Sequence, residues 1–459
     1  MSSSVVDTAD QSRKKQFIAR LKTGIPSGFL ANLSWQYVTT IWSMLVGFCY
    51  SLLLGRSLGV SEFGLYSLTI GFTTVVFQVF ELRLHEAVIR YVSEFWEQKD
   101  LPRMLATIRM SLLADVGSGF LALAAVVALM PLAGRFLVHD DRSVNLLLLA
   151  GITVFCSNVA TATAFGILRT FGQFRIQSLI TVTGTSLKLA ATYCAIKWFG
   201  CGVIGVMLVG IVSSFLMNAI MISVALRCVS QHVPLLHRTM SGLLQPRMKE
   251  MRSFVASTYF FSLTSIPTKE LDITLLGLFS SVHVVGAYKM AKNFITAMWA
   301  ISDPVFYVVY PELARLWARM EFAAIRSFLK KLTIILGVAG IMVYVCAMLV
   351  VPIVINYTLG QGYVDSVIIF RCMAWFILFW MPFLWINSLF LAAGKPELML
   401  KASVAGSLLT AVLYFVFIPL WGGSGAAFAY ALGTPLGLVF AFWVAKQARI
   451  FRHTAAEIS

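Results

Sequence analysis

A group of charged residues lies inside two very apolar stretches of the sequence. Lys269, Glu270 and Asp272 fall within "PTKELDITLLG", and Lys289 and Lys292 follow in the next apolar stretch. Amine and carboxylate side chains of this kind can bind an anion, exchange partners with each other, or take up and release a proton. A charge at the centre of a bilayer costs at least about 2.5 kcal/mol, so these residues need a structural or a functional explanation.

The surrounding chain has the composition of a polytopic membrane protein. Of its 459 residues, 59% are hydrophobic and 12% are charged, whereas a soluble domain has about 25% charged residues. Stretches of about 20 apolar residues can span a bilayer as helices. The twelve predicted spans are residues 33–55, 65–88, 106–131, 144–168, 174–199, 203–227, 253–278, 283–310, 328–354, 363–391, 396–419 and 424–445.

Lysine and arginine are distributed unequally between the loops that these spans create. With the N-terminus in the cytoplasm, most of the 36 lie on the cytoplasmic side. Those outside are Arg56, Arg135, Arg142 and Lys197. This bias supports twelve helices with both termini cytoplasmic. It also relates the formal net charge of +16 to the anionic inner leaflet and its lipids, rather than to nucleic acid.

An internal repeat divides the chain into two similar parts. The stretches "LLGRSLGVSEFGLY" and "LLGLFSSVHVVGAY" begin at Leu53 and Leu275 and match at six of fourteen positions, without a gap. The same offset pairs Gly172 with Gly394. Helices 1–6 and 7–12 are therefore expected to be two copies of one unit. Because six is even, both copies have the same orientation, and a pseudo-two-fold axis along the membrane normal should relate them.

The expected fold is an all-α polytopic membrane protein with twelve transmembrane helices in two six-helix bundles. Residues 1–32 are expected to form an interfacial segment, 33–227 the first bundle and 253–446 the second bundle. Residues 228–252 would be a cytoplasmic linker, and residues 447–459 a cytoplasmic tail.

Depth places the charged residues in one layer of the membrane. Lys269 precedes the end of its span by nine residues, and Lys292 follows the start of the next by nine. Because a helix rises by the same amount at every residue, these two lysines lie at a similar depth. On the second helix, one narrow stripe follows helical spacing and should face the other half or water. The stripe consists of Lys289, Lys292, Thr296, Trp299 and Asp303.

Two interpretations of this layer remain open. Asp272 could pair with Lys269, and Glu270 with a lysine of the next helix, solely to hold the hairpin together. However, the cations outnumber the acids, which favours an anionic substrate. The candidate anion-binding residues are Lys188, Lys269, Lys289, Lys292 and Arg371, with Arg83 as an inner contact. The carboxylates that could couple transport to an ion are Glu270, Asp272, Asp115 and Asp303.

A second charged cluster lies in "FELRLHEAVIRY", where the second helix meets the cytoplasm. Pairs four residues apart, such as Glu86 with Arg90, favour local pairing at a snorkelling helix end. Asp115 in the third helix has no evident local partner, so packing and ion coupling are equally compatible with it. One or two of the tryptophans at 375, 380 and 385 could stack on a sugar, although interfacial and packing roles are more common.

The sequence carries no motif of an enzyme or a cofactor site. It contains no Walker A, HExxH or GxSxG pattern, and its seven cysteines form no CxxC pair. We therefore expect no enzymatic activity and no cofactor. Any transport would have to use a gradient, for example of H⁺ or Na⁺.

Several passages resemble a known family when they are taken in order. They are "GRSLGVSEFGLYSL", "LDITLLGLFSSVHVVGAYKMAKNF", "YPELARL", "LGQGYVDS" and "AAGKPEL…IPLWGGSGAAFAYALG". Together they are similar to the polysaccharide-transporter branch of the multidrug/oligosaccharidyl-lipid/polysaccharide exporter superfamily, the O-antigen-type lipid-linked oligosaccharide flippases. Asp272 matches this family's aspartate in helix 7, whereas the motifs do not fix the cavity cations.

The resemblance implies a bacterial inner-membrane flippase. Such a protein moves an undecaprenyl-diphosphate-linked oligosaccharide to the periplasmic leaflet by alternating access, for exopolysaccharide, capsule or O-antigen synthesis. It implies coupling to protons or other cations, and it leaves room for a polysaccharide polymerase or export complex as a partner. The alternatives are a multidrug or other lipid-precursor exporter of the same superfamily, and a non-transporting membrane partner of a synthesis complex.

Overall fold

The computed structural model describes residues 29–138, 142–232, 245–263, 266, 270–300 and 303–448. Every regular element within these ranges is a helix. In the first half they include α2 (Phe29–Phe80), α3 (Leu84–Glu97), α4 (Leu101–Ala133), α5 (Ser143–Asn158), α6 (Thr161–Thr170), α7 (Phe174–Phe199) and α8 (Val203–His232). In the second half they include α9 (Gln245–Leu263), α10 (Asp272–Phe279), α11 (Val282–Ala300), α12 (Asp303–Ala318), α13 (Phe322–Thr358), α14 (Val364–Ala374), α15 (Phe376–Trp380), α16 (Trp385–Ala392) and α17 (Pro396–Gln447).

Eight helical stretches in the described ranges are long and apolar enough to cross a membrane. This confirms the all-helical, multi-pass class. Two stretches, Ser34–Glu97 and Glu397–Gln447, are 64 and 51 residues long, more than twice the roughly 20 residues that one crossing needs. Each is interrupted by a non-helical glycine, Gly59 in α2 and Gly422 in α17, so each supplies two arms. The count of twelve spans in two equivalent bundles remains a prediction.

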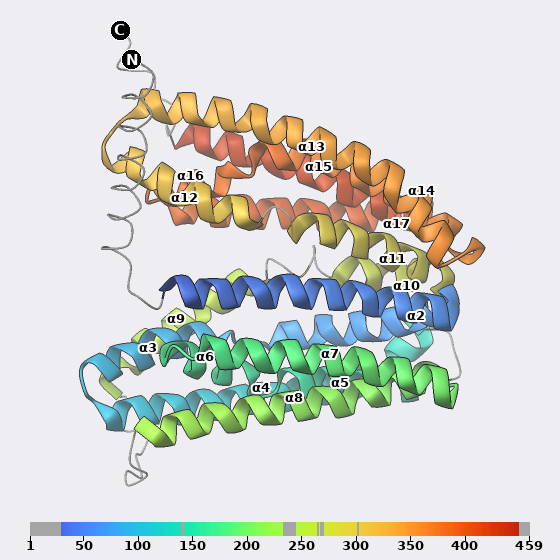
Figure 1. The fold of residues 1–459 in the computed structure, drawn as a ribbon, viewed down its shortest axis with the longest axis horizontal. Coiled ribbons are helices and arrows are strands. Elements are labelled where there is room, and N and C mark those ends of the chain that lie inside the picture. Colours follow the sequence, from blue (N-terminus) through green and yellow to red (C-terminus); the bar gives the residue numbers. More distant parts are fainter. Residues whose placement is uncertain are drawn as a thin grey trace, which may run out of the picture.

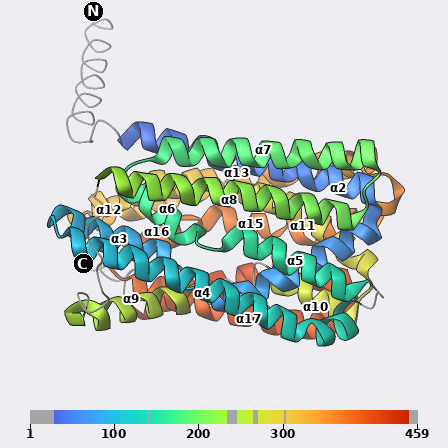
Figure 2. The same ribbon diagram turned by 90° about the horizontal axis from the view of Figure 1, so that it is seen from below.

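The helices form two groups that lie side by side along the length of the molecule (Figure 1). Helices α3–α8 make up one group, and α12–α17 make up most of the other. Helix α2 runs along the boundary and meets α10 and α11 at the end of the molecule where α14 also lies. The view turned by 90° shows the long helices running roughly along one common direction (Figure 2).

Glycines at equivalent repeat positions have the same backbone conformation. Gly172 and Gly394 both have φ +68°, in the turns that precede α7 and α17. Gly200 and Gly422 have φ +59° and +54°, and the same repeat offset relates them. Such left-handed conformations are accessible to glycine without steric cost. The two halves therefore end corresponding helices in the same way, as the repeat predicts.

The two groups meet at a glycine pair that is also related by the repeat offset. A Cβ atom on Gly64 of α2 would overlap the backbone carbonyl oxygen of Val282, and one on Gly286 of α11 would overlap that of Val60. Because neither glycine has a side chain, the backbones of α2 and α11 approach closely. The repeat offset relates Val60 to Val282 and Gly64 to Gly286, so each pair is one position of the repeat that occurs in both halves.

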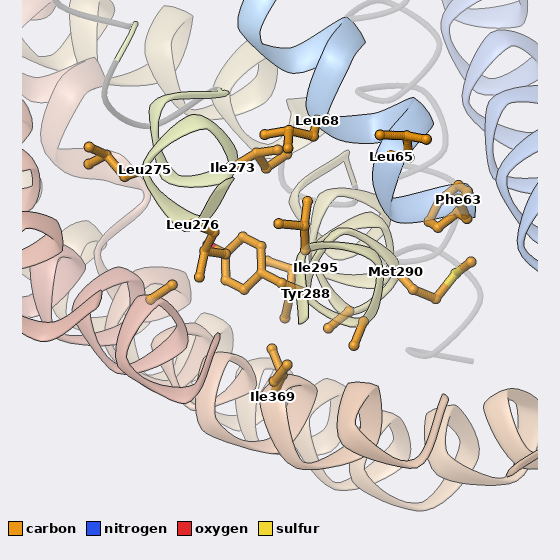
Figure 3. Packing of buried hydrophobic residues seen from close by; sticks show 14 of the residues in the cluster. Phe63, Leu65, Leu68, Ile273, Leu275, Leu276, Tyr288, Met290, Ile295 and Ile369 are labelled. Carbon is orange, nitrogen blue, oxygen red and sulfur yellow. The ribbon is translucent and has the colours of Figure 1, made fainter. Parts of the chain in front are cut away.

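Buried hydrophobic side chains from both groups surround this crossing. Leu65 and Leu68 from α2 belong to the same cluster as Leu276 from α10, Tyr288 from α11 and Ile369 from α14 (Figure 3). All five are nearly inaccessible to solvent. The α10–α11 hairpin, which carries the charged residues, is thus held against α2 by a continuous apolar core.

One predicted span is interrupted where the sequence disfavours a continuous helix, and another changes its helix type. In the span expected at 253–278, Glu270 and Leu271 are π-helical directly before α10. The span expected at 363–391 is divided by a short 3₁₀ turn at Met381–Phe383, because Pro382 lacks the N–H that an α-helix needs. The consequence is that charged and polar side chains lie beside irregular backbone.

Candidate functional site

A cavity of about 740 Å³ lies between α2 and the second group of helices. Its walls come from α2, α11, the α15–α16 region and both arms of α17. The predicted stripe on α11 faces this cavity, because Lys289, Lys292, Thr296 and Trp299 all line it. Asp303 is the first residue of α12, and its side chain lies outside the part that the structure describes.

Asp272 and Lys292 form a buried ion pair at the wall of the cavity. The Lys292 Nζ atom lies 2.8 and 2.7 Å from the two Asp272 carboxylate oxygens. The Tyr288 hydroxyl donates to the same carboxylate at 2.6 Å, and the Ile273 N–H donates at 2.8 Å. Asp272 is 0% exposed. The partner proposed from the sequence, Lys269, lies outside the described residues.

Lys289 and Glu270 form a second ion pair that the cavity can reach. The Lys289 Nζ atom lies 3.1 and 3.2 Å from the two Glu270 carboxylate oxygens. The two side chains are 23% and 22% exposed, and both line the cavity. Glycine at position 71 of α2 leaves room for Glu270 beside that helix. Lys289 and Glu270 can therefore separate and contact a ligand while the rest of the cavity keeps its shape.

A lysine of the first half lies beside two tyrosines of α2. The Lys188 ammonium lies over the Tyr50 ring, 5.3 Å from its centroid. The Tyr50 and Tyr66 hydroxyls are 3.4 Å apart. Among the described residues, no carboxylate forms an ion pair with Lys188. Lys188 and these two tyrosines are not among the residues that line the main cavity.

Three unpartnered buried polar atoms face the same cavity. They are the Gln78 Oε1, Asn293 Nδ2 and Trp380 Nε1 atoms, which find no hydrogen-bond partner in the described part of the protein. Trp299 stacks on Phe376 and lies 4.5 Å from Trp380, measured between ring centroids. Amide groups, an indole N–H and flat aromatic faces suit sugar hydroxyls and sugar rings. Sequence analysis missed Gln78 and Asn293, although each is an amide inside an apolar span.

A smaller cavity of about 330 Å³ lies in the first half, on the other side of α2. Gln78 and Thr74 line both cavities. Asp115 is buried in the smaller one and accepts hydrogen bonds from the Thr163 N–H and hydroxyl, both at 3.1 Å. The other polar lining residues include Glu81, His85, Asn158, Thr161 and Arg169. Asp115 of α4 therefore has a hydrogen-bond partner on α6, which the sequence of its own helix could not predict.

Arg83 and Arg371, like Lys188, are predicted anion-binding residues that do not line the main cavity. Arg83 precedes α3 with φ 48° and forms an ion pair with Glu86. Arg371 is exposed on α14 and does not line the main cavity. Arg90, expected to pair with Glu86, instead pairs with Glu250 of α9 at 3.3 Å. Among the described residues, no cluster of three or more His, Cys, Asp and Glu suits a metal ion.

Solved structures of transporters share this fold. The lipid II flippase MurJ in an inward closed conformation matches with TM-score 0.69 and 16% identity, over 89% of this chain and 87% of that chain. An inward-facing multidrug resistance MATE transporter of the MOP superfamily matches with TM-score 0.70 and 15% identity, over 92% and 96%. An outward-facing MATE transporter of the same superfamily matches with TM-score 0.52 and 16% identity, over 92% and 93%.

Sequence comparison identifies the family of this chain. No curated protein matches the chain in sequence. The family described as "Polysaccharide biosynthesis protein" matches residues 29–317, which is more than half of the chain. The match includes α2, the α10–α11 hairpin and the lysines and carboxylates that they carry. This chain therefore belongs to the polysaccharide biosynthesis protein family, with the fold of MOP-superfamily transporters.

Proposed function

We propose that this protein is a flippase for an undecaprenyl-diphosphate-linked oligosaccharide. It would move the repeat unit from the cytoplasmic to the periplasmic leaflet of a bacterial inner membrane, for exopolysaccharide, capsule or O-antigen synthesis. The observation that carries the proposal is the cavity itself. One space of about 740 Å³ combines lysines with unpartnered amide and indole groups and a tryptophan pair, which suits a substrate that is both anionic and a sugar.

The two ion pairs would have different roles. An exposed ion pair contributes about 0–1 kcal/mol, so a diphosphate that carries more charge than Glu270 can displace it from Lys289. Separating a buried pair costs about 3–5 kcal/mol, so Lys292 and Asp272 would stay together while the substrate binds. The full set of proposed anion-binding residues is Lys188, Lys269, Lys289, Lys292, Arg371 and Arg83.

The transport cycle would be alternating access between two six-helix bundles with both termini in the cytoplasm. We infer that the cavity opens to the cytoplasm in this conformation, because α2 and α11 are in close contact near the predicted outer ends of their spans. The close crossing at Gly64 and Gly286 would then be the closed outer side. Glu270, once displaced from Lys289, would be free to take up a proton or a cation. The other carboxylates proposed for ion coupling are Asp272, Asp115 and Asp303.

A transport assay tests the proposal. The full-length protein is reconstituted in liposomes with a fluorescent polyprenyl-diphosphate oligosaccharide, and leaflet transfer is followed with an impermeant quencher. We expect Lys289→Gln to reduce the transfer rate about tenfold, the loss of one charge-assisted contact. Lys330→Gln, which removes an exposed lysine on α13, is the matched control and should transfer like the wild type.

Other outcomes identify the alternatives. Normal transfer by both Lys289→Gln and Lys188→Gln would refute the cavity assignment. Export of a cationic drug without lipid transfer would favour the multidrug exporter. No leaflet transfer under any ion gradient would favour a non-transporting partner of a polymerase or export complex.

A further inference from the structure

A groove of about 660 Å³ runs along the membrane-facing side of α17, between its two arms. Leu408 and Trp443, at 62% and 50% exposed, are among its lining residues. Most of the other lining residues are also apolar, including Val404, Ala405 and Phe440. The groove is distinct from the main cavity, because no described residue lines both spaces.

One end of the groove carries polar side chains. Lys401 supplies a cationic group to the lining and is exposed, and Gln447 lies at the same end. Both residues are close to the predicted cytoplasmic ends of their arms, where a lysine can reach lipid phosphates. From Lys401 to Leu408 the first arm rises by roughly 10 Å, at about 1.5 Å per residue. The groove therefore follows the inner leaflet from its headgroup level towards the middle.

The wall between the groove and the main cavity contains two glycines. A Cβ atom on Gly406 would lie 3.6 Å from the Gly437 Cα atom, and the reverse distance is 3.7 Å. Both glycines line the main cavity. The groove lines the opposite side of the same two arms. At this level the two arms are in van der Waals contact through glycine, so the seam between the two spaces is closed, and it can open by separation of the arms without a side chain having to move out of the way.

We propose that this groove holds the polyprenyl chain of the lipid-linked substrate while its diphosphate lies beside Lys401, and that the substrate enters the cavity between Gly406 and Gly437. This inference rests on the proposed function. The bilayer interior is as apolar as the groove, so the chain gains little free energy by binding there. Selectivity for the substrate over other lipids would come from Lys401 and from the path into the cavity. Only a lipid whose headgroup binds in the cavity would follow that path.

Photocrosslinking tests the groove. The full-length protein in phosphatidylcholine nanodiscs is exposed to a polyprenyl diphosphate with a benzophenone near the diphosphate, and labelled residues are identified by mass spectrometry. We expect labels at Leu408, Phe440 or Trp443. Lys401→Gln should lower the yield about three- to tenfold, the contribution of one lysine near lipid phosphate. Lys330→Gln is the matched control. Ala405→Trp, which fills the groove, should abolish labelling, whereas Ile341→Trp on the exposed face of α13 should not.

A second variant tests the path into the cavity. Gly437→Leu should retain groove labelling but slow leaflet transfer at least tenfold. Gly117→Leu, at an exposed helical glycine with no atoms within 4 Å of its Cβ position, is the control. Labels spread evenly over α13 and α17, or full displacement by a tenfold excess of phosphatidylglycerol, would overturn the proposal.

The outcomes also separate this inference from the proposed function. Leaflet transfer with labels in the main cavity and none in the groove would refute the groove alone. Groove labels without transfer by the wild type would refute the flippase function and leave a polyprenyl-diphosphate binding site.

Discussion

Lys289 and Lys292 lie one helical turn apart, yet their surroundings give them different properties. Lys292 is nearly inaccessible and contacts both oxygens of a fully buried carboxylate. Lys289 is about a quarter exposed, and its partner Glu270 also lines the cavity. A buried charge without a partner is far more costly than an exposed one. Substitutions at Lys289 and Lys292 should therefore have different effects on stability and on transport.

The first prediction concerns the buried pair. Lys292→Met leaves the Asp272 carboxylate buried without its cation, and we expect a loss of about 3–5 kcal/mol of stability. Thermal unfolding in detergent measures it as a clear fall in Tm. The double variant Lys292→Met with Asp272→Leu removes both charges and should recover most of the loss. Lys289→Met, at the exposed pair, should lower stability by at most about 1 kcal/mol.

Equal Tm values for Lys292→Met and Lys289→Met would contradict this assignment.

Spacing alone predicted much of the site at the scale of single residues. The positions of Lys289, Lys292, Thr296 and Trp299 at helical spacing indicated one face, and this face does line the cavity. Spacing could not identify the partners, because both lysines can reach the preceding helix. It also could not find Tyr50 and Tyr66, since tyrosine is common in apolar spans and only the packing of α2 brings their hydroxyls together.

At the scale of elements, α9 belongs to the second half in sequence but is attached to the first half in space. Met251 of α9 is buried in the same cluster as Val88 and Tyr91 of α3. Arg90 pairs with Glu250, and Arg247 pairs with Glu94. Arg90 also lies over the Phe254 ring, 4.8 Å from its centroid. Helix α10, which follows, belongs to the cluster of the α10–α11 hairpin. The predicted span at 253–278 thus contributes its two helices to different hydrophobic clusters.

The second prediction concerns the attachment of α9. These charge pairs are substantially exposed, so they are weak individually and sensitive to salt. We expect the double variant Glu94→Gln with Glu250→Gln to increase tryptic cleavage at Lys249 or Arg252 about threefold at low salt, which corresponds to about 0.7 kcal/mol. In 1 M salt, the wild type should approach the variant.

Glu312→Gln, which removes an exposed pair with Arg315 in α12, is the control. Cleavage that is identical in the wild type and the double variant at low salt would show that the apolar contacts of Met251 alone hold α9.

The sequence predicted the long apolar spans well, and it predicted the short and broken ones less well. Hydropathy cannot tell a continuous helix from two pieces when both are apolar. Pro382 was the available signal for the interruption in the span at 363–391. The side of the molecule to which α9 attaches depends on pairing between residues far apart in the chain, such as Arg90 and Glu250, and no local pattern contains that information.

For the whole molecule, the repeat was the most informative feature of the sequence. It predicted equivalent halves from one constant offset between matching positions, and the equivalent glycines in the turns agree with it. It did not show where the halves touch, because a matched glycine can serve a turn, a bulge or a close approach equally well. Only the structure shows that Gly64 and Gly286 face each other across the boundary.

The third prediction concerns this crossing. Gly64→Ala and Gly286→Ala each place a methyl group where the opposing carbonyl oxygen lies, so each should separate α2 from α11. Spin labels at exposed Ser57 and Ser281, in a cysteine-free background, should report a longer mean distance for both variants. The two shifts should be similar in size, since the positions are related by the repeat.

Gly47→Ala, in the same helix α2 but with no atom within 4 Å of its Cβ position, should leave the distance unchanged. An unchanged distance in both Gly64→Ala and Gly286→Ala would mean that the crossing does not control the separation of the groups.

The crossing at Gly64 and Gly286 also bears on how such a protein can arise. The two residues are one position present twice, so the contact is formed by a surface and its own copy. An ancestral six-helix unit with a single glycine at this position would already have carried both sides of the contact, and two such units would meet there with two-fold symmetry. Gene duplication and fusion would then have had to preserve this contact rather than create it, and each copy could afterwards acquire its own charges.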